Sequence, residues 1–196
     1  MLVVPAAAPA TPAPLERCRT LGHVAGMSVA IRPATGADAG RLALVGAATF
    51  LETFAGTLDG DAIVAHCARV HAAAAYAEAL AGGARAWLAE AAPGAAPVGF
   101  ALLAAPDLPG AAPGDLELKR IYLLSRWQGG GTGAALLAAA TDAARAAGAP
   151  RLLLGVFAGN ARARAFYGRH GFRPVGERRF AVSGRAYDDV VLARPL

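Results

Sequence analysis

Cysteine is scarce in this chain of 196 residues, and the two that are present, Cys18 and Cys67, lie far apart. Their separation matches none of the spacings that zinc sites use, and a single distant pair does not indicate a disulfide framework. Nothing in the sequence requires an oxidising compartment. We therefore expect a cytoplasmic protein without a bound metal.

Long apolar runs and dense basic runs are also missing. No stretch is long and pure enough to span a bilayer, and the apolar start lacks the positive n-region of a signal peptide and is interrupted by prolines. The net charge of +5 comes mainly from scattered arginines that are not interleaved with aromatic residues. Nucleic acid and membrane are therefore disfavoured as partners, whereas an anionic cofactor is compatible with this charge.

Apolar residues make up 56% of the chain, and the length fits one domain with a full core. Much of the apolar share is alanine, which buries little area per residue. We interpret residues 1–27 as a flexible extension and residues 28–196 as one folded domain. Met27 directly precedes the first expected strand, so both Met1 and Met27 are candidate translation starts.

Hydrophobic periodicity predicts an α/β domain with a mixed, mostly antiparallel sheet flanked by helices. Thr35 and Asp38 have the spacing of a capping box at the start of the first helix. In the second helix Ile63 and Val64 are expected on the inner face. The expected elements are a strand at 28–33, a helix ending near Phe54, a helix from about Asp61 to Gly82, a hairpin over 84–105, a strand at 115–124, a helix over 135–148, a strand at 151–157, a helix over 160–170 and a hairpin over 172–196.

A glycine-rich loop lies between the strand at 115–124 and the following helix. Its successive backbone N–H groups, together with the positive end of the helix dipole, suit a diphosphate. A nucleotide P-loop would need Lys and then Ser or Thr where Ala134 and Ala135 stand. A dinucleotide fingerprint would belong after the first strand, and a tight turn without a ligand is the structural alternative. The loop comprises Gln128, Gly129, Gly130, Gly131, Thr132 and Gly133.

The spacing Gln128-x-x-Gly131-x-Gly133 resembles the coenzyme A pyrophosphate loop of the GCN5-related N-acetyltransferase (GNAT) superfamily. A second signature of that superfamily is matched by Asn160, Ala163, Phe166, Tyr167, Gly171 and Phe172. The resemblance covers roughly residues 28–196. Residues 48–57, with the segments around the loop and before Asn160, look most like the bacterial spermidine/spermine N-acetyltransferases of the superfamily.

The resemblance implies acetyl-CoA as co-substrate and assigns roles to several residues. Backbone groups of Ile121, Tyr122 and Leu123 would hold the pantetheine arm, and the glycine loop would hold the diphosphate. Asn160 would contact the cofactor in addition to capping its helix. Tyr167 would contact the cofactor sulfur and act as general acid toward the leaving thiolate; a core tyrosine bonded to a backbone group is the alternative.

The general base is less defined, because many relatives carry a glutamate on the strand before Asn160 and this chain has Gly155 at that place. Glu117 is a candidate base acting through water, and Glu52 is a candidate for binding a cationic amine. A solvated surface carboxylate is the alternative for each. Of Asp188 and Asp189 on the last strand, one is a candidate to face the substrate, but surface placement is the first expectation for both.

The sequence thus favours an enzyme that moves an acetyl group from acetyl-CoA to a primary amine of a small molecule by direct attack in a ternary complex. A polyamine is one candidate substrate. Three alternatives stay open, namely a non-catalytic acyl-CoA-binding module, a protein N-terminal or lysine acetyltransferase, and a dinucleotide-binding protein. Apolar strands near the C-terminus are compatible with a homodimer.

Overall fold

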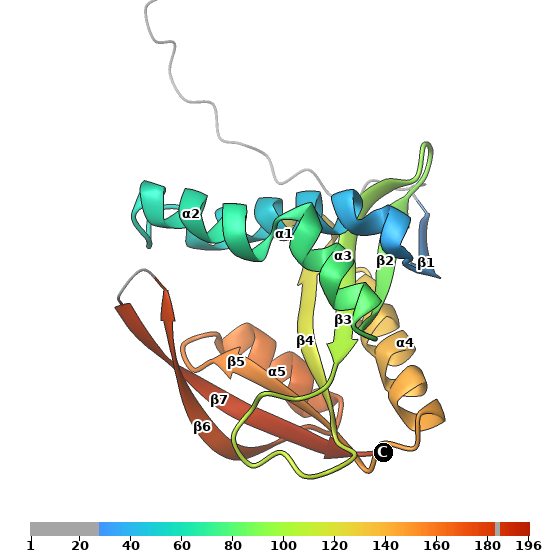
Figure 1. Ribbon diagram of the computed structural model, residues 1–196, viewed down its shortest axis with the longest axis vertical. Coiled ribbons are helices and arrows are strands. Elements are labelled where there is room, and N and C mark those ends of the chain that lie inside the picture. The colour runs from blue at the N-terminus through green and yellow to red at the C-terminus, as the bar shows by residue number, and fades with distance from the viewer. Residues whose placement is uncertain (1–27, 183–184) are drawn as a thin grey trace, which may run out of the picture.

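The computed structural model describes residues 28–182 and 185–196, and the expected N-terminal extension lies outside them. Helices cover both faces of a seven-stranded sheet with strand order β1-β2-β3-β4-β5-β7-β6 (Figure 1). Two short 3-10 turns, at Gly36–Asp38 and Ser125–Trp127, complete the chain. The elements are β1 Val29–Pro33, α1 Ala39–Phe54, α2 Gly60–Val70, α3 Ala73–Ala81, β2 Arg85–Ala91, β3 Ala96–Ala104, β4 Leu116–Leu123, α4 Thr132–Ala146, β5 Arg151–Phe157, α5 Ala161–Arg169, β6 Arg173–Val182 and β7 Arg185–Pro195.

The expected fold class is confirmed, and the expected order of elements differs at one place. The second predicted helix is divided into α2 and α3. At the break His71 is buried, with Nδ1 2.8 Å from the Tyr76 hydroxyl, and α3 packs on α1. Val64, expected inside, is 67% exposed. No proline or glycine marks this break, so tertiary packing decides it.

Two core clusters lie on opposite faces of the sheet. On one face, called here the α1 face, Leu42, Val45 and Tyr76 of the helices pack on Leu88 and Phe100 of the strands. The other face, called here the α4 face, carries α4 and α5. Its cluster takes in Leu136, Leu137, Leu118, Leu152, Leu154, Tyr167 and Phe172. Among the described residues, no helix is long and apolar enough to cross a membrane.

The pairing between β4 and β5 ends early. These two strands are parallel, and they pair only at Leu116 with Leu152 and at Glu117 with Leu153. Beyond this point β4 continues along β3, while β5 continues along β7. The two strands therefore diverge, as Figure 1 shows. We call the opening between residues 118–123 of β4 and residues 154–157 of β5 the split.

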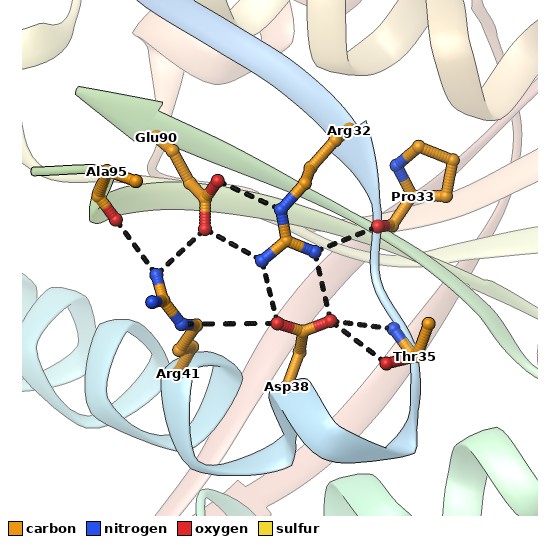
Figure 2. A network of polar contacts seen from close by, with 7 residues as sticks. All are labelled: Arg32, Pro33, Thr35, Asp38, Arg41, Glu90 and Ala95. Atoms are coloured by element: carbon orange, nitrogen blue, oxygen red, sulfur yellow. Dashed lines mark hydrogen bonds and ion pairs between the residues drawn. The ribbon is translucent and has the colours of Figure 1, made fainter. Parts of the chain in front are cut away.

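An ion-pair network fixes the start of α1 to the sheet (Figure 2). The Arg32 guanidinium of β1 contacts both oxygens of Asp38, at 2.7 and 3.0 Å, and both oxygens of Glu90 in β2. Arg41 of α1 donates to Glu90 at 2.8 Å. Asp38 accepts the Thr35 N–H at 2.9 Å, as the capping-box spacing predicted. Hydrogen bonds from Arg32 hold the pKa of the Asp38 carboxyl well below its usual range.

Replacing Asp38 by Asn should destabilise the fold. Two charge-assisted hydrogen bonds are lost, but Arg32 is 37% exposed, so we expect a cost of about 1–2 kcal/mol. Because the pKa is lowered in the folded state, this contribution is complete above the ordinary Asp pKa of about 3.9 and fades as the pH falls below it. Urea unfolding at neutral and acidic pH measures both effects.

Asp142→Asn is the matched control, since Asp142 is 74% exposed and its ion pair with Arg145, at 3.3 Å, lies at the surface. It should change stability by less than about 0.5 kcal/mol. Equal effects of the two substitutions at neutral pH would contradict a structural role for the network.

Candidate functional site

The edge of β4 that faces the split includes Ile121, Tyr122 and Leu123. Their opposite edge pairs with residues 99–101 of β3. The side chains of Ile121 and Leu123 pack in the α4-face cluster, and that of Tyr122 packs on the α1 face. Side-chain packing and a backbone edge open to a ligand are therefore compatible here, since the amide groups of a pantetheine arm can pair with such an edge.

The glycine loop takes a shape that needs glycine at two positions. Gly129 and Gly131 have φ angles of +89° and +87°, and Gly131 is the N-cap of α4. A Cβ added at either glycine would meet no other atom within 4 Å, so the loop backbone is open on that side. The Gln128 side-chain amide donates to the Leu123 carbonyl at 2.9 Å and fastens the loop to the end of β4. The geometry suits an anion at the helix N-terminus.

Gly131→Ala should therefore weaken coenzyme A binding. The left-handed backbone costs a residue with a Cβ about 1–2 kcal/mol, so the loop would relax toward another shape. We expect about a tenfold rise in Kd, which corresponds to about 1.4 kcal/mol. Calorimetric titration with coenzyme A measures it.

Gly148→Ala is its control, because Gly148 also has a positive φ of +74° with open space around it but follows the far end of α4. It should lower stability to a similar degree and leave the affinity unchanged. If both variants bind coenzyme A as tightly as the unmodified chain, the loop is only a turn.

Tyr167 of α5 is buried, with its ring 5.2 Å from the Phe166 centroid and 5.6 Å from that of Phe172. Its cluster also contains Leu123 of β4 and Val156 of β5, which flank the split. Burial raises the pKa of the phenol well above its ordinary value, with a smaller contribution from Tyr122. No hydrogen bond within the described ranges engages its hydroxyl, which differs from the core tyrosine that was the alternative. A neutral phenol is thus available as a donor.

Asn160 caps α5 as the sequence predicted. Its side-chain oxygen accepts the Ala163 N–H at 3.0 Å. The cap places the start of α5 directly after β5, at the open end of the split. A contact between Asn160 and a cofactor stays a prediction.

Glu52 lies on an exposed part of α1. Its two carboxylate oxygens accept from Ser125, at 2.9 Å from the backbone N–H and 2.6 Å from the hydroxyl. Glu52 therefore ties α1 to the turn that leads into the glycine loop. Its expected contact with an amine stays a prediction.

Glu117 is buried, whereas the sequence pattern placed it on an exposed face of its strand. It accepts from Lys119 at 2.7 Å and from the Asp107 N–H at 2.9 Å. The reason is the loop before β4, because Glu117 pairs with Leu153, which clusters with Leu108 of that loop. The solvated-carboxylate alternative is wrong for Glu117. Its expected role as a base stays a prediction.

Arg178 is a residue that the sequence reasoning missed, and it pairs with the buried Asp189. Asp189, expected at the surface, is 5% exposed, and Arg178 donates to its Oδ2 at 2.9 Å. Asp188 is exposed, as expected. Two adjacent acids on a strand must point to opposite faces, so one of this pair had to lie against the sheet with Val191. That alternation was the available signal. No group of three metal-binding side chains occurs in residues 28–182 and 185–196.

Comparison with known proteins agrees with this geometry. The model of the acetyltransferase (GNAT) family matches residues 51–172. The chain therefore belongs to the GNAT family of acetyltransferases. An uncharacterized N-acetyltransferase of Mycobacterium tuberculosis is 37% identical over 99 residues, which are 50% of this chain and 60% of that protein. The alignment thus spans less than two thirds of the mycobacterial relative.

Two solved structures show the same fold. The PaiA N-acetyltransferase of Thermoplasma acidophilum, in complex with coenzyme A, has a TM-score of 0.69 at 19% identity, over 86% of this chain and 99% of that one. A ribosomal-protein-alanine N-acetyltransferase of Brucella melitensis has a TM-score of 0.62 at 26% identity, over 85% and 99%.

Proposed function

We propose that this protein transfers an acetyl group from acetyl-CoA to a primary amine of a small molecule. The observation that carries the proposal is the hydroxyl of Tyr167, a residue with a buried ring that packs beside the split, because this hydroxyl has no hydrogen bond among the described residues. The glycine loop before α4 supplies a matching anion site on the same side of the sheet. The coenzyme A complex of the Thermoplasma relative supports this choice of co-substrate.

The residues present fit acetyl-CoA. Open N–H groups of the loop at 128–133 would hold its diphosphate, with the N-terminus of α4 adding its dipole. The free edge of β4 at 121–123 would pair with the amides of the pantetheine arm, and Asn160 would contact the arm from the start of α5. The thioester supplies the activated acetyl group.

In the proposed reaction the amine nitrogen attacks the thioester carbonyl carbon. A C–N bond forms, the C–S bond breaks, and the sulfur takes a proton from the Tyr167 hydroxyl. After the attack the nitrogen gives up a proton, and this proton returns through solvent to the Tyr167 oxygen and restores the phenol. Because burial keeps the phenol neutral, Tyr167 enters each cycle with the proton that the sulfur needs.

The substrate class follows from an open hollow of about 450 Å³ beside the end of β5. Three acidic residues and two arginines are among its lining residues, so their summed formal charge is −1 although the chain carries +5. A cationic amine suits this charge, and polyamines are the first class to test. The lining residues are Ala158, Glu177, Arg178, Arg179, Asp188, Asp189 and Val190. The expected cytoplasmic location and homodimer stay predictions.

Tyr167→Phe tests the proposed chemistry. We expect acetyl transfer to fall about 100-fold, because the leaving thiolate loses its proton donor, while coenzyme A binds as before. Release of free thiol, measured over a panel of amines that includes spermidine and a peptide with a free N-terminus, reports the rate. Tyr76→Phe removes a buried hydroxyl from the α1-face core and should leave the rate unchanged.

Three results would decide against the proposal or narrow it. Coenzyme A binding without turnover of any amine favours the non-catalytic module. Turnover of the peptide alone favours a protein acetyltransferase, as the Brucella relative is named. Stabilisation by NAD in preference to coenzyme A, in a thermal-shift comparison, favours a dinucleotide-binding protein.

A further inference from the structure

The two faces of the split carry different chemistry. Tyr167 packs with Leu154 and Val156 on the α4 face of β5. Because β5 and β7 pair Phe157 with Asp189 and Gly155 with Val191, the side chain of Asp189 lies on the α1 face. A phenol and a carboxylate therefore lie on opposite sides of the same short strand, at the end where it leaves β4.

The missing side chain at Gly155 makes room for this carboxylate. A Cβ added there would lie 3.3 Å from Asp189 Oδ2 and 3.0 Å from Arg178 Nη2, which is tighter than ordinary packing. The acid and its partner thus reach across the β5 backbone next to the split. The position that lacks an acid in the sequence is covered by an acid from β7.

The Asp189 carboxylate is held by one oxygen. Arg178 Nη2 donates to Oδ2 at 2.9 Å, and within the described residues Oδ1 accepts no hydrogen bond. The residue lines the negatively charged hollow proposed above for the amine. One oxygen is therefore fixed by Arg178, and the other is left without a hydrogen-bond partner in the described part of the chain.

Arg178 is itself positioned from β4. Glu117 and Asp107 both pair with Lys119 Nζ, at 2.7 and 3.0 Å. The same Asp107 oxygen lies 3.5 Å from Arg178 Nη1. This chain of opposite charges crosses from β4 to β6, and it engages Oε2 of Glu117, which also accepts the Asp107 N–H. Glu117 is thus a candidate for holding Arg178 in place through Lys119 and Asp107.

Burial raises the pKa of the Asp189 carboxyl above its ordinary value, and Arg178 opposes this shift. Burial is also the main cause that raises the pKa of the Tyr122 phenol on β4, and the charge on Asp189 adds to this shift. Asp189 is therefore a stronger base than a surface aspartate. The charge of Arg178 favours its ionised form. The other charged groups around it are Asp107 through Arg178, and Glu177, Arg179 and Asp188 in the hollow.

We propose that Asp189 is the general base of the acetyl transfer and accepts a proton from the attacking ammonium on the α1 face of the split. The ammonium N–H bond breaks toward Oδ1, which leaves a neutral amine that attacks the carbonyl carbon, and the proton later passes to solvent. On the α4 face, Tyr167 gives its proton to the sulfur. This inference rests on the proposed function, and Arg178 is its positioning residue.

Asp189→Asn tests the proposal in the full chain. We expect kcat to fall about 100-fold with an unchanged Kd for coenzyme A. The rate of the unmodified enzyme should decline as the pH falls through the Asp189 titration, and the variant should lose this acidic limb. Asp115→Asn is the control, because Asp115 is also buried and paired with an arginine, Arg151, at 2.6 Å, but lies beside the far end of β5. It should keep both the rate and the pH profile.

A second variant keeps the test decisive if Asp189→Asn does not fold. Arg178→Gln removes the charge that lowers the Asp189 pKa, so the acidic limb should move to higher pH. Normal turnover and an unchanged acidic limb in Asp189→Asn would overturn the proposal. It would also be overturned if Glu117→Gln lost the acidic limb while Asp189→Asn kept it. An inactive unmodified enzyme would instead refute the proposed function, and this inference with it.

Discussion

The early end of the β4–β5 pairing is the constraint on which the rest of the structure depends. Only two residue pairs join these parallel strands, and each strand then follows a different neighbour. Backbone groups that a continuous sheet would satisfy internally are left along one edge of β4. The sequence stabilises this arrangement because α4 and α5 pack across both strands on the α4 face. A ligand rich in amides can pair with the free edge of β4. The early end of the β4–β5 pairing thus weakens the sheet and also creates a place for such a ligand.

Charge links the two halves of the sheet on the opposite face. Lys119 and Arg178 alternate with three carboxylates from β4, the loop before it and β7. Ion pairs of this kind, which are partly exposed here, seldom stabilise a fold more than apolar packing would, since screening and desolvation offset their attraction. Their value here is positional. The network fixes Arg178, which in turn fixes one oxygen of Asp189 beside Gly155 and the split.

The local features of the site could be predicted from the sequence, and the features that depend on distant pairing could not. The glycine loop, the Asn160 cap and the order of strands follow from short-range patterns, and the structure has them. The burial of Glu117 depends on the loop before β4, which folds over that face of the strand, and no spacing in the sequence reveals this. The burial of Asp189 depends on which face of β7 the rest of the chain covers. The break between α2 and α3 depends on His71 packing inward against Tyr76.

A crystal structure of the protein with coenzyme A tests the central claim most directly. The account predicts the diphosphate on the loop at 128–133, the pantetheine arm paired with the β4 edge inside the split, and the sulfur within hydrogen-bond distance of the Tyr167 hydroxyl. It also predicts an open path from that sulfur to Asp189. Coenzyme A bound elsewhere, or a sulfur out of reach of Tyr167, would contradict the account.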